Sequence, residues 1–204
     1  APLFSLFTRA VARERAYRDF IQTNVDPGPD GRLLDCGCGN GRLIKHLGSS
    51  VDYTGFDLSD AYVHRARRLH GDRGRFLTAS VDDPTLTFEA PFDSILCGGL
   101  LHHLPDEVAT GLLTRAAGWL GDGGRVVTYD TCVLPDSGRI AKWFMKRDRG
   151  QHVRDPGAYR ALAQSAFFDV ETIELRNLNR IPYDILVMIC RNPVTTPDIL
   201  PPET

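Results

Sequence analysis

From residue 31 onward, short apolar runs of strand length alternate with longer segments in which apolar residues recur at helical spacing. The strand-like runs predict strands at 32–37, 51–57, 74–81, 91–99 and 125–132, with a final pair within 169–191. Helices are expected at 40–48, 59–72, 105–124, 138–147 and 155–167. Strands that alternate with helices pair in parallel under helices on both faces, so the pattern predicts an α/β fold. The short connection within the final pair predicts one antiparallel strand.

Residues 1–26 carry a separate apolar stripe at helical spacing. We expect a helical extension that packs on the main domain, because one buried face accounts for the stripe without a membrane surface. Arg9, Arg13 and Arg15 interrupt the apolar stretch that a signal peptide needs, so none is expected. Residues 192–204 are rich in proline and are expected to form a poorly ordered tail of a single domain.

Composition places the chain among ordinary globular proteins. Of its 204 residues, 42% are hydrophobic and 25% are charged, and the formal net charge of −2 offers no basic field for nucleic acid. The five cysteines form no pair at the spacing of a zinc or redox motif, which favours free thiols in the cytoplasm. No apolar run reaches the roughly 18 residues of a membrane span, so no membrane partner is expected.

The stretch LLDCGCGNGR at 33–42 places three glycines directly after the first expected strand. Gly37, Gly39 and Gly41 favour a sharp bend or a close approach of backbone to a ligand. Ligands of such sheets bind at the carboxyl ends of the strands, where the next helix would point its positive end. Asp57 closes the second strand, 20 residues after Gly37, and a carboxylate there can bind both ribose hydroxyls. The loop therefore predicts a cofactor that contains a nucleoside.

Two classes of nucleoside cofactor compete for this loop. Dinucleotide enzymes use G-x-G-x-x-G, whose third glycine would fall at position 42, where this chain has Arg42. Asp35 lies two residues before the first glycine, and its carboxylate would repel a pyrophosphate. S-adenosylmethionine carries a ribose and an ammonium group, which tolerates or uses that charge. The D-x-G-x-G-x-G spacing therefore favours S-adenosylmethionine over a nicotinamide dinucleotide.

Several motifs together resemble the class I S-adenosylmethionine-dependent methyltransferases, especially the small type 11 group. LLDCGCGNG covers the end of the first strand, GFDLS the end of the second and FDSILCGGLLHHL the fourth, and GDGGRVV leads into the fifth. The resemblance covers residues 31–190. It implies a Rossmann-like, doubly wound sheet of seven strands in the order 3-2-1-4-5-7-6, with strand seven antiparallel and helices on both faces.

The resemblance also implies which residues hold the cofactor, whose product would be S-adenosylhomocysteine. The residues expected along its methionine part are Asp35, Gly37, Cys38, Gly39, Cys97 and Gly98. The residues expected along the ribose and the adenine are Asp57, Leu58, Ser80, Val81 and Asp82. Among these, Asp57 would bind the ribose hydroxyls and Asp82 the adenine amino group.

Methyl transfer needs groups that position the acceptor and remove its proton, because the sulfonium is already a good leaving group. His102 and His103 follow the fourth strand, and Asp130 ends the fifth on the same edge of the sheet. An imidazole can take a proton near neutral pH, and a neighbouring carboxylate can orient it. The alternative is structural, with one histidine capping the next helix or bonding backbone. Adjacent histidines chelate one ion poorly, so no metal is expected.

Residues 131–154 lie where an insertion often covers the acceptor pocket in this fold. The segment carries six basic and two acidic residues, and its aromatic residues could form apolar walls. We expect a lid suited to an anionic small molecule, with a solvated amphipathic helix as the alternative. The candidate acceptor contacts are Trp143, Arg149, His152 and Tyr183.

The sequence thus predicts histidine-assisted methyl transfer from S-adenosylmethionine to an oxygen or nitrogen of a small molecule, with carbon as a further option. A methyltransferase for RNA or protein is the alternative, because the basic segment could follow phosphates. The N/D-P-P-Y/F motif, frequent after strand four in enzymes that methylate amino groups of nucleic acids, is absent. A NAD-dependent oxidoreductase and a non-catalytic cofactor-binding protein are weaker alternatives. A monomer and a homodimer are both compatible with the sequence.

Overall fold

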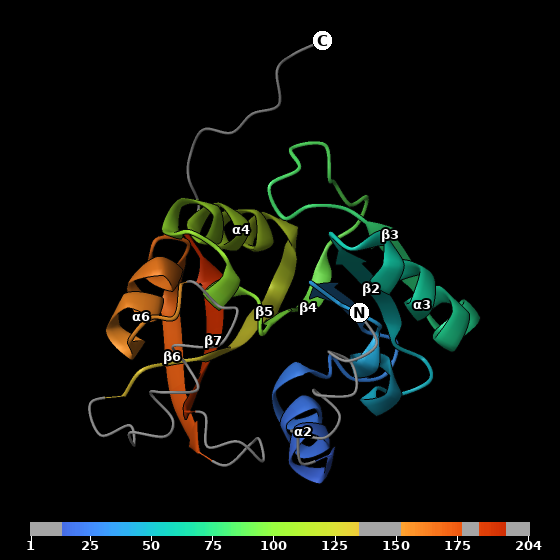
Figure 1. Cartoon of the computed structure of the whole chain (residues 1–204), viewed down its shortest axis with the longest axis horizontal. Coiled ribbons are helices and arrows are strands. Elements are labelled where there is room, and N and C mark those ends of the chain that lie inside the picture. The colour runs from blue at the N-terminus through green and yellow to red at the C-terminus, as the bar shows by residue number, and fades with distance from the viewer. Residues whose placement is uncertain (1–13, 135–151, 177–183, 195–204) are drawn as a thin grey trace.

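The computed structural model describes residues 14–134, 152–176 and 184–194, which form one seven-stranded sheet in the order β3-β2-β1-β4-β5-β7-β6 (Figure 1). Strand β7 runs antiparallel to both of its neighbours, and all other pairs are parallel. The strands are β1 (Arg32–Cys36), β2 (Asp52–Asp57), β3 (Arg75–Thr78), β4 (Phe92–Gly98), β5 (Leu120–Thr131), β6 (Phe167–Arg176) and β7 (Asp184–Pro193). The predicted strand order and the antiparallel strand are confirmed.

Helices cover both faces of this sheet (Figure 1). One face packs on α2 (Glu14–Phe20), on the single π-helical turn at Ile21–Val25 that continues it, and on α3 (Asp60–His70). The other face packs on α4 (Asp106–Trp119) and α6 (Pro156–Gln164). Each face buries its own apolar cluster, as expected for strands whose side chains alternate between two covered faces.

The helix predicted at 40–48 is shorter than expected and of the 3-10 type. The structure has a 3-10 turn of five residues there, Arg42–His46, and Gly41 before it has a left-handed φ of 72°. A Cβ atom on Gly41 would lie 2.8 Å from His70 Cδ2 and 2.8 Å from Phe76 Cε1. Only glycine fits this backbone and this space, so no regular helix can begin before residue 42. A long helix dipole therefore does not point at the loop.

The two ends of the predicted lid at 131–154 pair with each other just beyond β5. Cys132 forms a parallel bridge with Arg154, and the Val133 N–H donates to the Arg154 carbonyl at 3.1 Å. Residues 135–151 lie outside the described residues, so a lid over an acceptor stays a prediction. The segment at 152–154 is held by the bridge to Cys132, and it also contacts the turn that carries His102.

The ends of the chain are described only in part. Residues 1–13 of the predicted extension and 195–204 of the predicted tail lie outside the described residues. The tail was expected from residue 192, but β7 continues to Pro193, where it pairs with Phe167. Within the described ranges, no helix is both long and apolar enough to cross a membrane. All five cysteines are free and buried, and the cytoplasmic location inferred from them stays a prediction.

Candidate functional site

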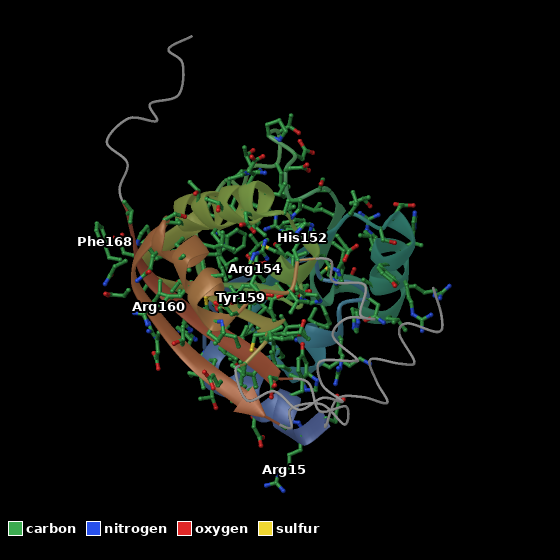
Figure 2. The ribbon with its side chains drawn as sticks, turned by 60° about the vertical axis from the view of Figure 1, so that its left-hand side comes forward. Arg15, His152, Arg154, Tyr159, Arg160 and Phe168 are labelled. Atoms are coloured by element: carbon green, nitrogen blue, oxygen red, sulfur yellow. The ribbon has the colours of Figure 1, made fainter. Side chains whose placement is uncertain are left out.

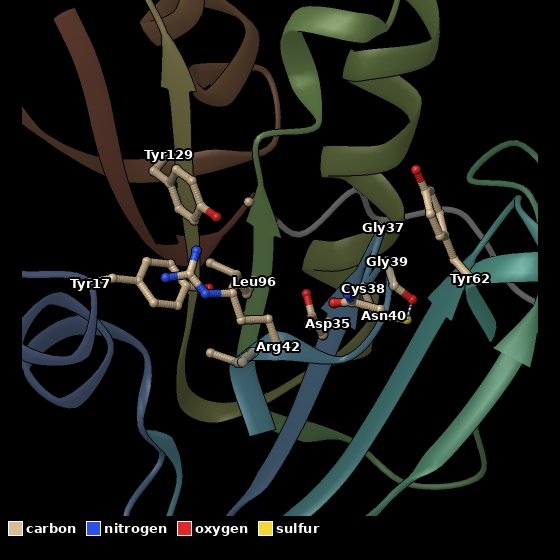
Figure 3. A pocket seen from close by; sticks show the side chains of 12 residues that line it. Tyr17, Asp35, Gly37, Cys38, Gly39, Asn40, Arg42, Tyr62, Leu96 and Tyr129 are labelled. Atoms are coloured by element: carbon tan, nitrogen blue, oxygen red, sulfur yellow. Dashed lines mark hydrogen bonds between the residues drawn. The ribbon is translucent and has the colours of Figure 1, made fainter. Parts of the chain in front are cut away.

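A pocket lies at the carboxyl ends of β1, β4 and β5, with Tyr17 of α2 at one side (Figure 3). Its lining residues are Tyr17, Asp35, Gly37, Cys38, Gly39, Asn40, Arg42, Leu43, Tyr62, Leu96, Gly98 and Tyr129. The structure thus brings together five of the residues predicted for the methionine part: Asp35, Gly37, Cys38, Gly39 and Gly98. The pocket lies at the edge of the sheet where ligands of doubly wound folds bind.

Asp35 is a buried carboxylic acid at the end of β1 and faces the pocket (Figure 3). Burial raises the pKa of Asp35 to about 7, a shift that the hydrogen bond from the Tyr53 hydroxyl opposes and the charge of Asp57 increases. The Tyr53 hydroxyl donates to Asp35 Oδ2 at 2.7 Å. The ionised form of Asp35 is costly in this environment, so a cationic ligand would stabilise it.

The glycine loop uses its backbone N–H groups within the protein. Gly37 and Cys38 both donate to the Phe56 carbonyl, at 2.8 and 2.9 Å. The Gly39 N–H donates to Asp57 Oδ2 at 2.9 Å, and the Gly41 N–H donates to the Cys38 carbonyl. Phosphate-binding loops instead direct such N–H groups at the ligand. This loop therefore does not present these four donors to a pyrophosphate.

Asp57 is fixed beside the loop at the end of β2. Its Oδ1 accepts from the Ser59 N–H at 2.8 Å and its Oδ2 from Gly39, so the loop and the carboxylate hold each other in place. A carboxylate has about four acceptor positions, so both oxygens can accept further hydrogen bonds. The neighbouring Leu58 is 75% exposed, so its side chain offers an apolar surface on which a flat ligand could pack.

The other residues predicted for the nucleoside part follow β3 on the same edge. The Ser80 hydroxyl bonds to Asp82 Oδ1, and the Val81 carbonyl accepts from Arg115 at 2.8 Å. Neither these residues nor Asp57 and Leu58 line the pocket itself. Cys97 lies between two lining residues of β4, but its own side chain is buried in the cluster on the α4 face.

Sequence reasoning missed the aromatic and basic residues that close one end of the pocket. The Arg42 guanidinium lies 4.3 Å from the centre of the Tyr17 ring and donates to Glu14 Oε2 at 2.7 Å. Tyr17 packs edge-on against His46 and Tyr129. Figure 3 shows Arg42 and Tyr17 at one end of the pocket and Tyr62 at the other. Arg42 follows the loop directly, which is a usable signal, whereas nothing local in the sequence marks Tyr17.

The structure brings His102 and Asp130 together as predicted. His102 lies in a 3-10 turn, Leu101–His103, and its Nδ1 is 2.7 Å from Asp130 Oδ1. The same oxygen accepts the His102 backbone N–H at 3.2 Å. His102 is 7% exposed and Asp130 is 2% exposed, so water competes little for this pair. The His103 ring is exposed and lies 4.1 Å from the His102 ring, centre to centre.

Of the four predicted acceptor contacts, only His152 lies within the described residues. His152 is half-buried, and its backbone N–H donates to the His102 carbonyl at 3.0 Å. Trp143, Arg149 and Tyr183 lie outside the described residues. Among the residues that are described, no three His, Cys, Asp or Glu side chains are grouped so that they could hold a metal ion.

Residues 34–126 match a family model whose description is "Methyltransferase domain". This part of the chain, less than half of its length, is similar to methyltransferase domains. The resemblance to the class I S-adenosylmethionine-dependent methyltransferases is thereby confirmed for this part of the chain. A curated relative, the ubiquinone biosynthesis O-methyltransferase of Xylella fastidiosa strain 9a5c, is 33% identical over 113 residues. That match covers 53% of this chain and 44% of the relative, so the chain matches less than half the length of that protein.

Solved structures show that the fold extends beyond the matched residues. A protein of Bordetella parapertussis superposes with a TM-score of 0.69 over 89% of this chain and 68% of its own, at 18% identity. Human N-acetylserotonin methyltransferase, solved in complex with S-adenosylmethionine, superposes with a TM-score of 0.66 over 87% of this chain and 51% of its own, at 20% identity. At these identities the likeness establishes the fold.

Proposed function

We propose that this protein transfers a methyl group from S-adenosylmethionine to an oxygen or nitrogen of a small molecule. The observation that carries the proposal is the pocket at the methyltransferase glycine loop, which combines a buried carboxylic acid with N–H groups bonded inside the protein. Such a pocket suits a cofactor with a cationic end and disfavours a nicotinamide dinucleotide. Relatives named O-methyltransferases favour oxygen as the methylated atom, with nitrogen and carbon as alternatives.

In this proposal the cofactor supplies an electrophilic methyl group, and residues of this chain bind its two ends. Asp35 pairs with the ammonium group, and Arg42, whose guanidinium reaches the pocket, pairs with the carboxylate of the methionine part. Asp57 accepts hydrogen bonds from the ribose hydroxyls. The remaining proposed cofactor contacts are Gly37, Cys38, Gly39, Leu58, Ser80, Val81, Asp82, Cys97 and Gly98. S-adenosylhomocysteine is the product.

His102 is the proposed group that removes the acceptor's proton. Its Nδ1 is bonded to the Asp130 carboxylate, which assigns the proton to Nδ1 and leaves Nε2 as the basic nitrogen. Asp130 fixes the ring and stabilises the imidazolium that forms when Nε2 takes a proton. His103 is more exposed and is the second candidate for this role. Trp143, Arg149, His152 and Tyr183 stay proposed acceptor contacts, and an anionic acceptor stays a prediction.

The test uses cofactor binding and turnover together. We expect S-adenosylhomocysteine at 100 times its Kd to stabilise the protein by about 2.7 kcal/mol in thermal denaturation, and NADH to give no shift. With radiolabelled S-adenosylmethionine and a panel of phenols, amines and carboxylic acids, His102→Gln should reduce turnover about 100-fold or more while Kd for S-adenosylhomocysteine is kept. His103→Gln is the matched variant.

Three outcomes would each overturn one part of the proposal. Stabilisation by NADH alone would exclude a methyltransferase. Full turnover in the His102 variant, with loss in the His103 variant, would move the base to His103. Labelling of RNA or of a protein, with no small molecule labelled, would favour the alternative acceptor classes. The basic segment that supports a nucleic-acid acceptor lies largely outside the described residues, and a monomer or a homodimer stays a prediction.

A further inference from the structure

Arg154 lies near the candidate base and donates five hydrogen bonds to other described residues. It is 9% exposed, and its guanidinium lies inside the molecule with Tyr159, whereas Phe168 points away from the ribbon (Figure 2). We propose that Arg154 is a positioning residue for the His102–Asp130 pair, acting through the backbone that carries His102. The inference rests on the proposed function, because it assigns Arg154 a role in the chemistry of His102.

The Arg154 guanidinium donates hydrogen bonds to backbone carbonyls on both sides of His102. Nη1 donates to the Leu101 and His152 carbonyls, each at 2.9 Å, and Nη2 donates to the Leu104 carbonyl at 2.7 Å. Its Nε and Nη2 donate to Asp106 Oδ1, at 2.9 and 2.6 Å. One side chain therefore fixes the residue before His102, the end of the turn and the first residue of α4.

The segment that contains Arg154 also holds His102 itself. The His152 N–H donates to the His102 carbonyl at 3.0 Å, and Arg154 in turn binds the His152 carbonyl. The chain at 152–154 is attached to the sheet through the bridge between Cys132 and Arg154, two residues beyond Asp130. Arg154 thus connects the backbone around His102 with the strand that supplies its carboxylate partner.

The His102 ring depends on this support because Asp130 holds it through one oxygen. Asp130 Oδ1 accepts both the backbone N–H and the ring of His102, whereas Oδ2 is buried and has no hydrogen-bond partner in the described part of the chain. A shift of the turn would break both bonds to Oδ1 together. Arginine suits the task because its planar fork presents five donors in fixed directions, whereas lysine presents a single flexible ammonium group.

The experiment compares Arg154→Lys, Arg154→Gln and Asp106→Asn, with Arg160→Gln as the matched control on the exposed side of α6. The readout is the ring N–H resonance of His102 in proton–nitrogen NMR, assigned by its absence in His102→Gln. We expect both Arg154 variants to lose the resonance or to exchange it at least tenfold faster. Asp106→Asn, which keeps all three carbonyl contacts, should retain it, as should the Arg160 variant.

Binding of S-adenosylhomocysteine verifies that each variant is folded, and Arg154→Lys carries the test if Arg154→Gln does not fold. A retained, slowly exchanging His102 resonance in Arg154→Lys would overturn the proposal, because the fork of donors would then be dispensable. Loss of the resonance in Asp106→Asn as well would also overturn the proposal, because the ion pair between Arg154 and Asp106, and not the carbonyl contacts, would then position His102. If the resonance behaves as expected but His102→Gln keeps full turnover, the proposed base fails while the positioning of His102 by Arg154 stands.

Discussion

At the scale of single residues, the protonation of Asp35 makes the charge of the pocket depend on pH. Its carboxyl is buried, accepts one hydrogen bond from Tyr53 and has a pKa of about 7. The folded protein therefore binds one more proton than the unfolded chain between about pH 4 and 7, so this group's contribution to stability falls as the pH rises through that window. A cation in the pocket reverses the preference, because it stabilises the ionised form.

We therefore predict that cofactor binding releases a proton from Asp35. Affinity for S-adenosylhomocysteine, which keeps the ammonium group, should rise about tenfold from pH 6 to pH 8 and then level off. Asp35→Asn should bind more weakly and without this pH dependence, whereas Asp52→Asn, at an exposed carboxylate, should behave as the unchanged protein does. Isothermal titration in buffers of different ionisation enthalpy measures the released proton. A flat pH profile in the unchanged protein would contradict the assignment.

At the scale of elements, the turn after β1 is decided by glycine rather than by helix propensity. Gly37, Gly39 and Gly41 all have positive φ, at 74°, 55° and 72°, so the backbone bends back on itself instead of entering a helix. This bend is what lets Gly39 reach Asp57 at 2.9 Å. The glycine loop and the end of β2 therefore form one unit, and the binding site depends on both.

Replacing Gly41 tests how strictly this element requires glycine. Gly41→Ala should destabilise the protein by about 1–3 kcal/mol, because its φ is left-handed and the new Cβ would meet His70 and Phe76 at 2.8 Å. Gly111→Ala, in α4 with open space around it, should instead stabilise the protein by about 1 kcal/mol. Urea denaturation compares the two. Equal effects would mean that the loop tolerates a side chain.

The elements that the sequence predicts well are those whose signal is local. Each central strand is a short apolar run between turn residues, and the pairing of β1 with β4 follows from the order that the family resemblance implies. The segment at 40–48 has apolar residues at helical spacing, but the space around Gly41 is set by α3 and β3, far along the chain. The partners of Arg154 cannot be predicted locally for the same reason, since they lie about 50 residues earlier.

At the scale of the whole molecule, the N-terminal segment completes a pocket built by the central strands. Phe20 packs edge-on against Tyr129 of β5, and Arg125 of the same strand donates to the carbonyls of Asn24 and Asp26, at 2.7 and 2.8 Å. Tyr17 and Arg42 meet across the pocket's edge. The site is therefore assembled from segments more than 100 residues apart, all on one face of the sheet.

Ligand binding should consequently protect distant segments at the same time. We predict that S-adenosylhomocysteine slows hydrogen exchange in 14–25 and in 37–42 together, because Tyr17 and Arg42 both line the pocket. Exchange in α4, on the opposite face, should change little. Mass spectrometry of exchanged peptides measures this. Protection confined to 37–42 would show that α2 covers the pocket without responding to its ligand.

Because the N–H groups of the glycine loop are bonded within the protein, the site should discriminate among ligands that contain adenosine. ATP offers the same base and sugar as S-adenosylmethionine, but it carries a chain of anionic phosphates at the 5′ position. The four loop N–H groups already bonded within the protein cannot compensate those charges, and Asp35 repels them when it is ionised. Discrimination against nucleotides is thus set by the conformation of one short turn, and an excess of ATP should leave the occupancy of the site by its cofactor unchanged.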